Sequence, residues 1–274
     1  MSRAPLIVLG AGGRMGRRIM ALADADSGAR VAAAVEIAGS PLAGRDAGEL
    51  AGTAPLGVAV VSDLSQAISM AGAGAVVIDF TAPEAALEHA RCAADAGSPL
   101  VIGTTGFSRA QRDEIEALAS RIPVLLSANM SIGVNVLLGL VGDAVRRLGP
   151  AFDIEIVEVH HNRKKDAPSG TALALAEAAA KASGADPARD FTLAREGMTG
   201  ERRKGEIGVV ALRGGDNVGE HTVMLLGTGE RVELSHRASS RDCLAAGAVR
   251  AGAWIYGKAP GLYSMQDVLG LPGG

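Results

Sequence analysis

The densest group of reactive side chains in the sequence lies in residues 158–171. Two adjacent histidines, His160 and His161, follow an alternating apolar segment, and three cations follow at residues 163–165. A Pro-Ser-Gly-Thr turn then opens a predicted helix at Gly170. Imidazoles exchange protons near neutral pH, and cations beside a helix N-terminus bind anions. The segment therefore predicts a site for a small dianion next to a proton donor, although a charged run is also typical of a solvated loop.

A glycine-rich segment near the start of the chain predicts a dinucleotide site. It follows a short apolar run and precedes an amphipathic one, and its residues are Gly10, Ala11, Gly12, Gly13, Arg14, Met15 and Gly16. In a Rossmann fold such a loop places a pyrophosphate against the backbone N–H groups of a helix N-terminus. The spacing differs from the common G-x-G-x-x-G, so the motif alone is a weak signal. Glu36 strengthens it, because it ends the second predicted strand about 20 residues later, where an acid hydrogen-bonds a ribose.

Glu36 also bears on the choice of nicotinamide cofactor. A carboxylate accepts hydrogen bonds from ribose hydroxyls and repels a 2′-phosphate, and its neighbour Ile37 carries no positive charge. Arg14 is the nearby partner that a 2′-phosphate would have. The sequence therefore favours NADH, or use of both cofactors, over strict use of NADPH.

Two further loops of small polar residues follow predicted parallel strands. The first contains Gly103, Thr104, Thr105 and Gly106, and the second contains Ser127, Ala128, Asn129 and Met130. Ligands of open α/β sheets bind outside the carboxyl ends of the strands, so both loops are expected to face one crevice. Ordinary turns use the same residue types, which is the alternative interpretation of each loop.

The elements that must position these residues change character along the chain. Residues 1–128 alternate short apolar runs with amphipathic ones, which predicts a Rossmann-type, doubly wound parallel sheet in a dinucleotide-binding domain. Residues 129–238 contain successive strand candidates joined by glycine-rich turns, which predicts a second α+β domain with a mixed or antiparallel sheet for substrate binding and oligomerisation. A C-terminal helix within 239–274 is expected to pack back on the first domain.

Composition excludes several classes of protein. Hydrophobic residues make up 48% of the chain, which is enough to form a folded core. The 27 basic and 30 acidic residues give a net charge of −3, so neither nucleic acid nor an anionic membrane is an expected partner. Only Cys92 and Cys243 are present, which gives no disulfide framework. Adjacent histidines alone do not make a zinc site, so no metal is expected. The longest apolar runs are too short to span a membrane, and the expected compartment is the cytoplasm.

Seven motifs across nearly the whole chain resemble those of the 4-hydroxy-tetrahydrodipicolinate (dihydrodipicolinate) reductases, in the same order. Of these, His-His-x-x-Lys-x-Asp-Ala-Pro-Ser-Gly-Thr is the most specific, whereas the glycine loop is not specific by itself. The motifs are Gly10 to Gly16, Asp79 to Thr81, Gly103 to Gly106, Ser127 to Asn129, Glu158 to His161, Lys164 to Thr171, and Arg213 to Asp216 with Gly219 to Thr222.

The resemblance implies an NADH- or NADPH-dependent reductase of lysine and diaminopimelate biosynthesis. Its substrate would be a cyclic dicarboxylate, (2S,4S)-4-hydroxy-2,3,4,5-tetrahydrodipicolinate, which loses water to give tetrahydrodipicolinate. By this resemblance His160 is the acid/base, Lys164 is the proton donor or cationic stabiliser, and His161, Gly170 and Thr171 hold a substrate carboxylate. The cofactor would contact Gly10 to Met15, Glu36, Gly103 to Thr105 and Ser127 to Met130. Members are usually homotetramers.

The sequence departs from better-known members of that family at several positions. Ile37 and Ala82 stand where arginine is frequent, Met130 and Leu244 stand where aromatic residues are frequent, and Asn162-Arg163 replaces a common Arg-His pair. Two other functions compete with the reductase. One is a different two-domain NAD(P) oxidoreductase, and the other is a dinucleotide-sensing protein without catalysis, which would have no need of His160 and Lys164.

Overall fold

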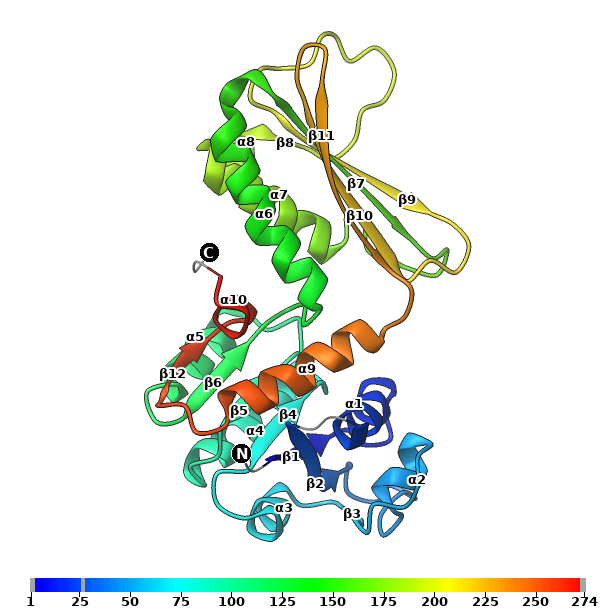
Figure 1. The fold of residues 1–274 in the computed structure, drawn as a ribbon, viewed down its shortest axis with the longest axis vertical. Coiled ribbons are helices and arrows are strands. Elements are labelled where there is room, and N and C mark those ends of the chain that lie inside the picture. Colours follow the sequence, from blue (N-terminus) through cyan, green and yellow to red (C-terminus); the bar gives the residue numbers. More distant parts are fainter. Residues whose placement is uncertain (1–2, 26–27, 272–274) are drawn as a thin grey trace. The chain divides into compact units, whose positions relative to one another are not determined.

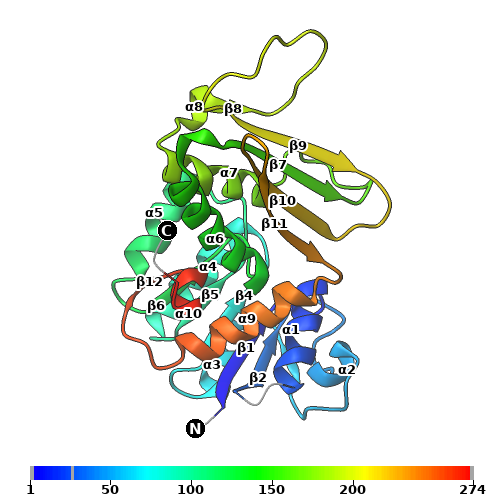
Figure 2. The ribbon, with the colours of Figure 1, turned by 45° about the horizontal axis from the view of Figure 1, so that its top comes forward.

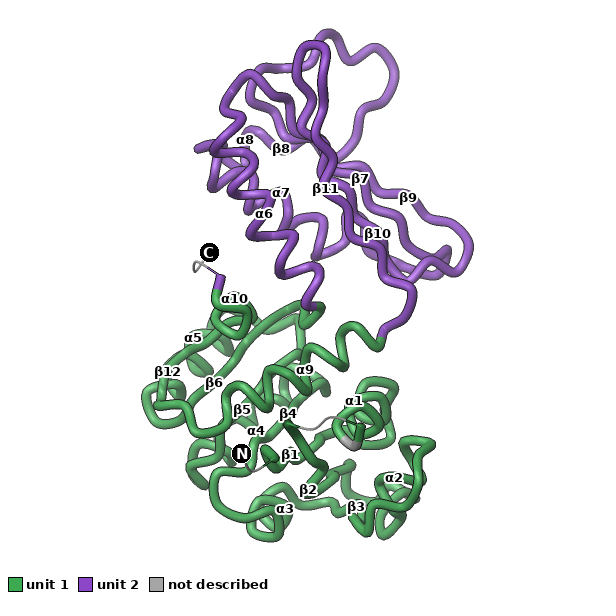
Figure 3. Tube along the Cα trace, viewed as in Figure 1, with its two compact units in different colours: residues 1–131, 242–270 green, residues 132–241, 271–274 purple. Residues whose placement is uncertain are grey.

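The chain forms two compact units, each described here by itself. A computed structural model describes residues 3–25 and 28–271. Unit 1 comprises Met1–Ser131 and Asp242–Gly270, and unit 2 comprises Ile132–Arg241 and Leu271–Gly274 (Figure 3). The units therefore meet in the sequence at residues 131/132 and 241/242, where sequence analysis expected boundaries at 128/129 and 238/239. Among the described residues, no helix is both long and apolar enough to cross a membrane.

Unit 1 is built on a seven-stranded sheet in the order β12-β6-β5-β4-β1-β2-β3, and every paired strand is parallel. Its central strands are continuous apolar runs, because helices cover both faces of such a sheet. The strands are β1 (Ala4–Leu9), β2 (Ala29–Val35), β3 (Val60–Val61), β4 (Val76–Asp79), β5 (Leu100–Ile102), β6 (Pro123–Leu126) and β12 (Gly261–Tyr263).

Local signals in the sequence account for where many of the unit 1 helices begin. Asp46, Asp63 and Ser108 accept backbone N–H groups as N-caps of α2, α3 and α5, and Pro83 occupies the first turn of α4. The helices are α1 (Arg14–Ala25), α2 (Ala47–Ala51), α3 (Leu64–Ala71), α4 (Pro83–Asp95), α5 (Arg109–Leu118), α9 (Asp242–Ile255) and α10 (Met265–Leu269). Figures 1 and 2 show α9, drawn in orange, lying along the strands of this unit.

The C-terminal part of the chain differs from the single helix that was predicted within 239–274. Helix α9 ends at Ile255, and Gly257 follows with a φ of 77°, the left-handed conformation that commonly ends a helix. Residues 261–263 then form β12, which pairs parallel with β6 at the edge of the sheet. A three-residue strand has too few residues to show a hydrophobic period, so only its pairing with β6 identifies it.

Unit 2 contains a five-stranded mixed sheet in the order β11-β10-β7-β9-β8. Strands β7, β8 and β9 pair parallel, whereas β10 pairs antiparallel with both β7 and β11. With the parallel sheet of unit 1, this mixed sheet confirms the predicted fold class. The strands are β7 (Asp153–His160), β8 (Phe191–Thr192), β9 (Ile207–Arg213), β10 (Gly219–Leu226) and β11 (Arg231–Ala238), and the helices are α6 (Ile132–Leu148), α7 (Gly170–Ser183), the short α8 (Pro187–Asp190) and a 3₁₀ turn at Gly149–Ala151.

The core of unit 2 lies between the sheet and helices α6 and α7, which cover one of its faces (Figure 2). Strand β7 alternates, so Ile154 and Ile156 enter this core, and Glu158 and His160 lie on the same face further along. The strand thus carries apolar core residues at its start and ionisable residues at its end, where the candidate site begins.

Candidate functional site

A buried carboxylate holds one nitrogen of the predicted acid/base histidine. His160 Nδ1 lies 2.5 Å from Oε2 of Glu158, whose side chain is completely buried. An ionised carboxylate only accepts hydrogen bonds, so Nδ1 carries the hydrogen and Nε2 is the nitrogen left for chemistry. A Cβ atom at Gly219 would lie 2.9 Å from Nε2, so glycine at this position of β10 keeps the space beside that nitrogen open.

Glu158 joins three elements of unit 2 at this point. Arg213, at the end of β9, donates to both carboxylate oxygens over 2.7 and 2.8 Å, and Ser169 donates its backbone N–H to Oε1 over 3.0 Å. Burial alone would raise the pKa of Glu158, but the hydrogen bonds from Arg213, His160 and Ser169 outweigh it and lower that pKa. The carboxylate is therefore ionised and orients the His160 ring.

A second buried histidine, His221 of β10, completes this cluster. Its ring meets the His160 ring edge-on with 5.2 Å between centroids, and its Nε2 lies 3.2 Å from Ser169 Oγ. Burial, followed by the charge of His160, lowers the pKa of His221 to about 4. His221 is therefore neutral near pH 7 and packs against His160 without adding a charge.

The anion-binding side of the site is built by the basic loop and the start of α7. Ser169 caps this helix, because its hydroxyl oxygen accepts the N–H of Ala172. The backbone N–H groups of Gly170 and Thr171 belong to the same first turn. Lys164 Nζ lies 3.0 Å from Asp166 Oδ2. Burial, then the charges of Arg163 and Arg241, lowers the pKa of His161. The structure thus places the predicted catalytic and substrate residues together at the end of β7 and the start of α7.

In unit 1 the glycine loop joins β1 directly to α1. Gly10 has a φ of 62°, and a Cβ atom at Gly16 would lie 2.2 Å from the Gly10 carbonyl oxygen, so the turn requires glycine at both positions. Glu36 approaches the loop: its Oε2 accepts the N–H of Gly12 over 2.7 Å, and its Oε1 accepts the N–H of Ile37 over 3.0 Å. The predicted ribose acceptor therefore lies beside the predicted pyrophosphate loop.

The other two predicted cofactor segments follow β5 and β6, which are neighbours in the sheet. Thr104 is buried and donates its hydroxyl to Asp79, and Ser127 Oγ donates to the carbonyl of Asn129. Met130 is 1% exposed, so its side chain belongs to the core and only its backbone is available for binding a ligand.

The sequence alone assigns no role to Glu158, Arg213, His221 or Asp79. A usable signal existed for the first of these, because a carboxylate two residues before a histidine on a strand shares its face. The contacts of Arg213 and His221 come from strands β9 and β10, whose register with β7 no local pattern reveals.

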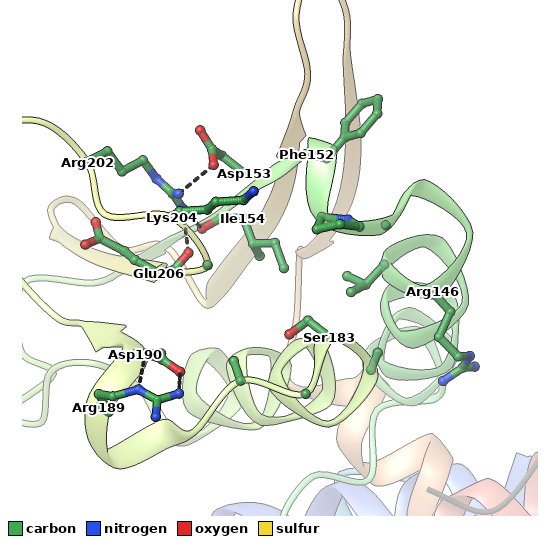
Figure 4. Close-up of a pocket in the computed structure, with 17 residues that line it drawn as sticks. Arg146, Phe152, Asp153, Ile154, Ser183, Arg189, Asp190, Arg202, Lys204 and Glu206 are labelled. Atoms are coloured by element: carbon green, nitrogen blue, oxygen red, sulfur yellow. Dashed lines mark hydrogen bonds and ion pairs between the residues drawn. The ribbon is translucent and has the colours of Figure 1, made fainter.

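A cavity of about 590 Å³ in unit 2 lies away from these residues, at the opposite end of β7. Figure 4 shows two ion pairs among the side chains that line it: Arg189 with Asp190 at 2.8 Å and Arg202 with Asp153 at 2.7 Å. Within residues 3–25 and 28–271, no three or more His, Cys, Asp or Glu side chains are placed so that they could hold a metal ion.

Comparisons with known proteins agree with the two-part architecture. Two family models match the chain, "Dihydrodipicolinate reductase, N-terminus" over residues 4–130 and "Dihydrodipicolinate reductase, C-terminus" over residues 133–269. A 4-hydroxy-tetrahydrodipicolinate reductase of Anaeromyxobacter dehalogenans (strain 2CP-C) is 55% identical over 269 residues, 98% of each chain. One of Geobacter sulfurreducens is 49% identical over 266 residues, 97% of this chain and 98% of the relative.

Among solved structures, a dipicolinate-bound dihydrodipicolinate reductase from Paenisporosarcina sp. TG-14 has the same fold, with a TM-score of 0.76 at 22% identity. The match covers 97% of this chain and 99% of the Paenisporosarcina chain. The family models together span nearly the whole chain, and the curated relatives share about half of its residues. The chain belongs to the dihydrodipicolinate reductase family.

Proposed function

We propose that His160 and Lys164 carry out the proton chemistry of this reductase, in which 4-hydroxy-tetrahydrodipicolinate loses water and is reduced to tetrahydrodipicolinate on the route to diaminopimelate and lysine. The observation that carries the proposal is the Glu158–His160 pair at 2.5 Å, buried beside the capped start of α7. The pair leaves Nε2 of His160 available, and the loop that follows supplies Lys164.

The chemistry requires a proton donor and a dianion site. When bound, a reduced nicotinamide supplies the hydride. Its addition to a conjugated imine gives an enamine that must be protonated, and a positioned acid contributes about 10²- to 10⁴-fold to such a step. His160 Nε2 is the proposed acid, with Lys164 as second donor or cationic stabiliser. His161 and the N–H groups of Gly170 and Thr171 are the proposed partners of a substrate carboxylate.

A nicotinamide cofactor is supported by the match to the N-terminal family model and by the glycine loop. Its proposed contacts are the backbone of residues 10–15 and Glu36 in unit 1, with residues 103–105 and 127–130. We propose NADH, or both cofactors, because Glu36 is a carboxylate and Ile37 beside it is 76% exposed without charge. The test compares kcat/KM for NADH and NADPH, and a preference for NADPH above about 50-fold, roughly 2.3 kcal/mol, contradicts the proposal.

The catalytic assignment is tested by alanine variants. Oxidation of NADH is followed by its absorbance, with substrate made in situ from pyruvate and aspartate semialdehyde by the preceding aldolase. We expect His160→Ala and Lys164→Ala each to lower kcat by at least about 10²-fold while the Kd for NADH stays within about threefold. Lys181→Ala, at the far end of α7, removes the same charge and is expected to retain parental activity.

Two outcomes contradict the catalytic assignment. If a variant at residue 160 or 164 retains most of the parental kcat, that residue does not donate the proton. If the parent oxidises neither NADH nor NADPH in the presence of the substrate, the proposed reaction is wrong. The homotetramer and the cytoplasmic location stay predictions from the resemblance and the composition.

A further inference from the structure

A buried carboxylate in unit 1 has no role in the chemistry proposed above. Asp79 is the last residue of β4, the strand between β5 and β1 in the sheet, and it is 0% exposed. Burial of a carboxylate is costly unless hydrogen bonds compensate it. Its position at the carboxyl end of a central parallel strand is where ligands of open α/β sheets bind.

Four hydrogen bonds compensate the burial of Asp79. Oδ1 accepts the N–H and the hydroxyl of Thr81 over 2.8 and 2.7 Å and the hydroxyl of Thr104 over 2.9 Å, and Oδ2 lies 2.6 Å from His89 Nδ1. Burial raises the pKa of Asp79, but the hydrogen bonds from His89 and Thr81 outweigh it, and the net effect lowers that pKa. The carboxylate is therefore ionised.

An ionised Asp79 dictates the direction of every hydrogen bond it makes. A carboxylate has no hydrogen to give, so the Thr81 and Thr104 hydroxyls both donate to it. Each hydroxyl oxygen keeps only acceptor capacity for any other partner. One charge thus sets the rotamers and the polarity of two side chains on different loops.

The two loops held by Asp79 are those next to the predicted nicotinamide dinucleotide. Thr104 belongs to residues 103–106, and a Cβ atom at Gly103 would lie 2.1 Å from the Phe80 ring, so the two loops also pack on each other. Thr81 reaches the glycine loop, since its Cγ2 lies 3.3 Å from where a Cβ atom at Gly10 would be. Asp79 therefore connects segments that follow β4 and β5 and, through Thr81, the segment that follows β1.

We propose that Asp79 is a positioning residue for the dinucleotide, which holds the loops after β4 and β5 in their binding conformation and makes acceptors of the Thr81 and Thr104 hydroxyls. The proposal rests on the proposed use of a nicotinamide cofactor by unit 1. The matching ligand groups are donors, such as a carboxamide NH₂ or a ribose hydroxyl. Asp79 acts through the loops and is not itself a ligand contact, because it is fully buried.

His89 of α4 holds the other oxygen of the carboxylate, with a side chain that is 26% exposed. It is the titratable group that faces Asp79, whereas the partners on Oδ1, Thr81 and Thr104, are uncharged. An ionised Asp79 accepts Nδ1–H from either charge state of the imidazole. The arrangement therefore tolerates protonation of His89 as long as residue 79 is a carboxylate.

The test measures the Kd for NADH by its fluorescence, which needs no turnover. We expect Asp79→Ala to raise this Kd at least about tenfold and Thr104→Val at least about threefold, because loops that lose their anchor bind less well. Since the Kd is independent of the reaction, failure of the proposed chemistry leaves this test intact. An unchanged Kd in Asp79→Ala overturns the positioning role while the proposed reaction stands.

Asp79→Asn supplies a readout that a merely structural residue would not change. The amide keeps the shape of the carboxylate, and its oxygen can still accept the N–H of Thr81 and the hydroxyls of Thr81 and Thr104. We expect the Kd of this conservative variant to stay within about threefold of the parental value, well below the Kd of Asp79→Ala. A Kd raised as much in Asp79→Asn as in Asp79→Ala overturns the proposal.

Ala90→Gly is the matched control for general destabilisation. Ala90 is buried on the same helix as His89 and touches none of the hydrogen bonds of Asp79. The glycine lowers the melting temperature through helix propensity and lost packing, and we expect the Kd for NADH to stay within about twofold of the parental value. If this variant weakens NADH binding as much as Asp79→Ala does, the effect is one of stability, and the positioning role is wrong.

Discussion

At the scale of single residues, each unit contains a buried carboxylate that orders the polar groups around it. Glu158 holds His160 and Asp79 holds the loop threonines, and both are kept ionised by the donors around them. Each carboxylate accepts the hydrogen atoms of its partners, which leaves Nε2 of His160 and the acceptor lone pairs of the Thr81 and Thr104 hydroxyls without a hydrogen. Such groups need no contact with a substrate to matter for binding or catalysis.

His221 makes the stability of the protein depend on pH. Its pKa is lowered to about 4, below the ordinary value near 6.5, so between these values the unfolded chain takes up a proton that the folded chain does not. Its contribution to the free energy of unfolding is complete above about pH 6.5 and falls as the pH drops toward 4, by up to about 3 kcal/mol. Urea unfolding across this pH range is expected to show that the free energy of unfolding falls by at least about 1 kcal/mol less in His221→Gln than in the parent. Equal decreases in the two proteins contradict this prediction.

At the scale of elements, helix α9 packs so closely on neighbouring backbone that one of its positions requires glycine. Helix α9 begins with Asp242, whose carboxylate is paired in two places with Arg18 of α1 at 2.7 Å. Further along α9, Gly247 packs on the segment after β6, and a Cβ atom there would lie 1.7 Å from the carbonyl oxygen of Met130. The helix therefore rests on backbone of a predicted cofactor loop, and its glycine is required by packing.

Gly247→Ala is expected to lower the free energy of unfolding by about 1 to 3 kcal/mol, because the added methyl group forces α9 away from Met130. Thermal or urea unfolding measures the change. Gly139→Ala in α6 is the matched control, since its Cβ atom would meet its nearest neighbour at an ordinary 3.7 Å. Alanine favours a helix over glycine by about 1 kcal/mol, so this control is expected to be neutral or stabilising. Destabilisation of both variants by equal amounts contradicts the packing argument.

At the scale of the whole molecule, unit 1 is discontinuous in sequence. Six strands of its sheet come from residues before Ser131, and the seventh strand, β12, returns with α9 and α10 after unit 2 has been completed. Helix α9 packs on several strands of the sheet with apolar and small residues, among them Ala248, Val249 and Ile255. The dinucleotide half of the chain therefore depends on its last thirty or so residues to cover its sheet.

A chain truncated after Arg241 is expected to lose NADH binding altogether, although it retains every residue assigned to the cofactor. The reason is the loss of α9, which leaves the apolar face of the sheet uncovered. NADH fluorescence and circular dichroism measure binding and secondary structure in the truncated and full-length chains. Retention of the parental Kd by the truncated chain shows that α9 is dispensable for unit 1.

Several features followed from the sequence alone because their physical signals are local. A buried parallel strand shows as an apolar run, as in Leu6 to Leu9, and a turn before a helix shows as glycines, as in Gly10 to Gly16. The His160 to Thr171 segment places its chemistry in consecutive residues, so its composition and order were enough to predict a dianion site and the family. The strand β12 and the role of Asp79 had no such signal.

Only the tertiary structure decided which residues from distant parts of the sequence pair with the two buried carboxylates. Glu158 gains Arg213 from β9 and faces His221 of β10 through strand pairing, and Asp79 gains His89 from α4 and Thr104 from the next loop. Periodicity shows which face of an element is buried, but it carries no information on which partner lies opposite. The sequence therefore determined the fold class and the family and predicted the chemistry, whereas the folded chain decided which nitrogen of His160 is available and how the loops after β4 and β5 are held.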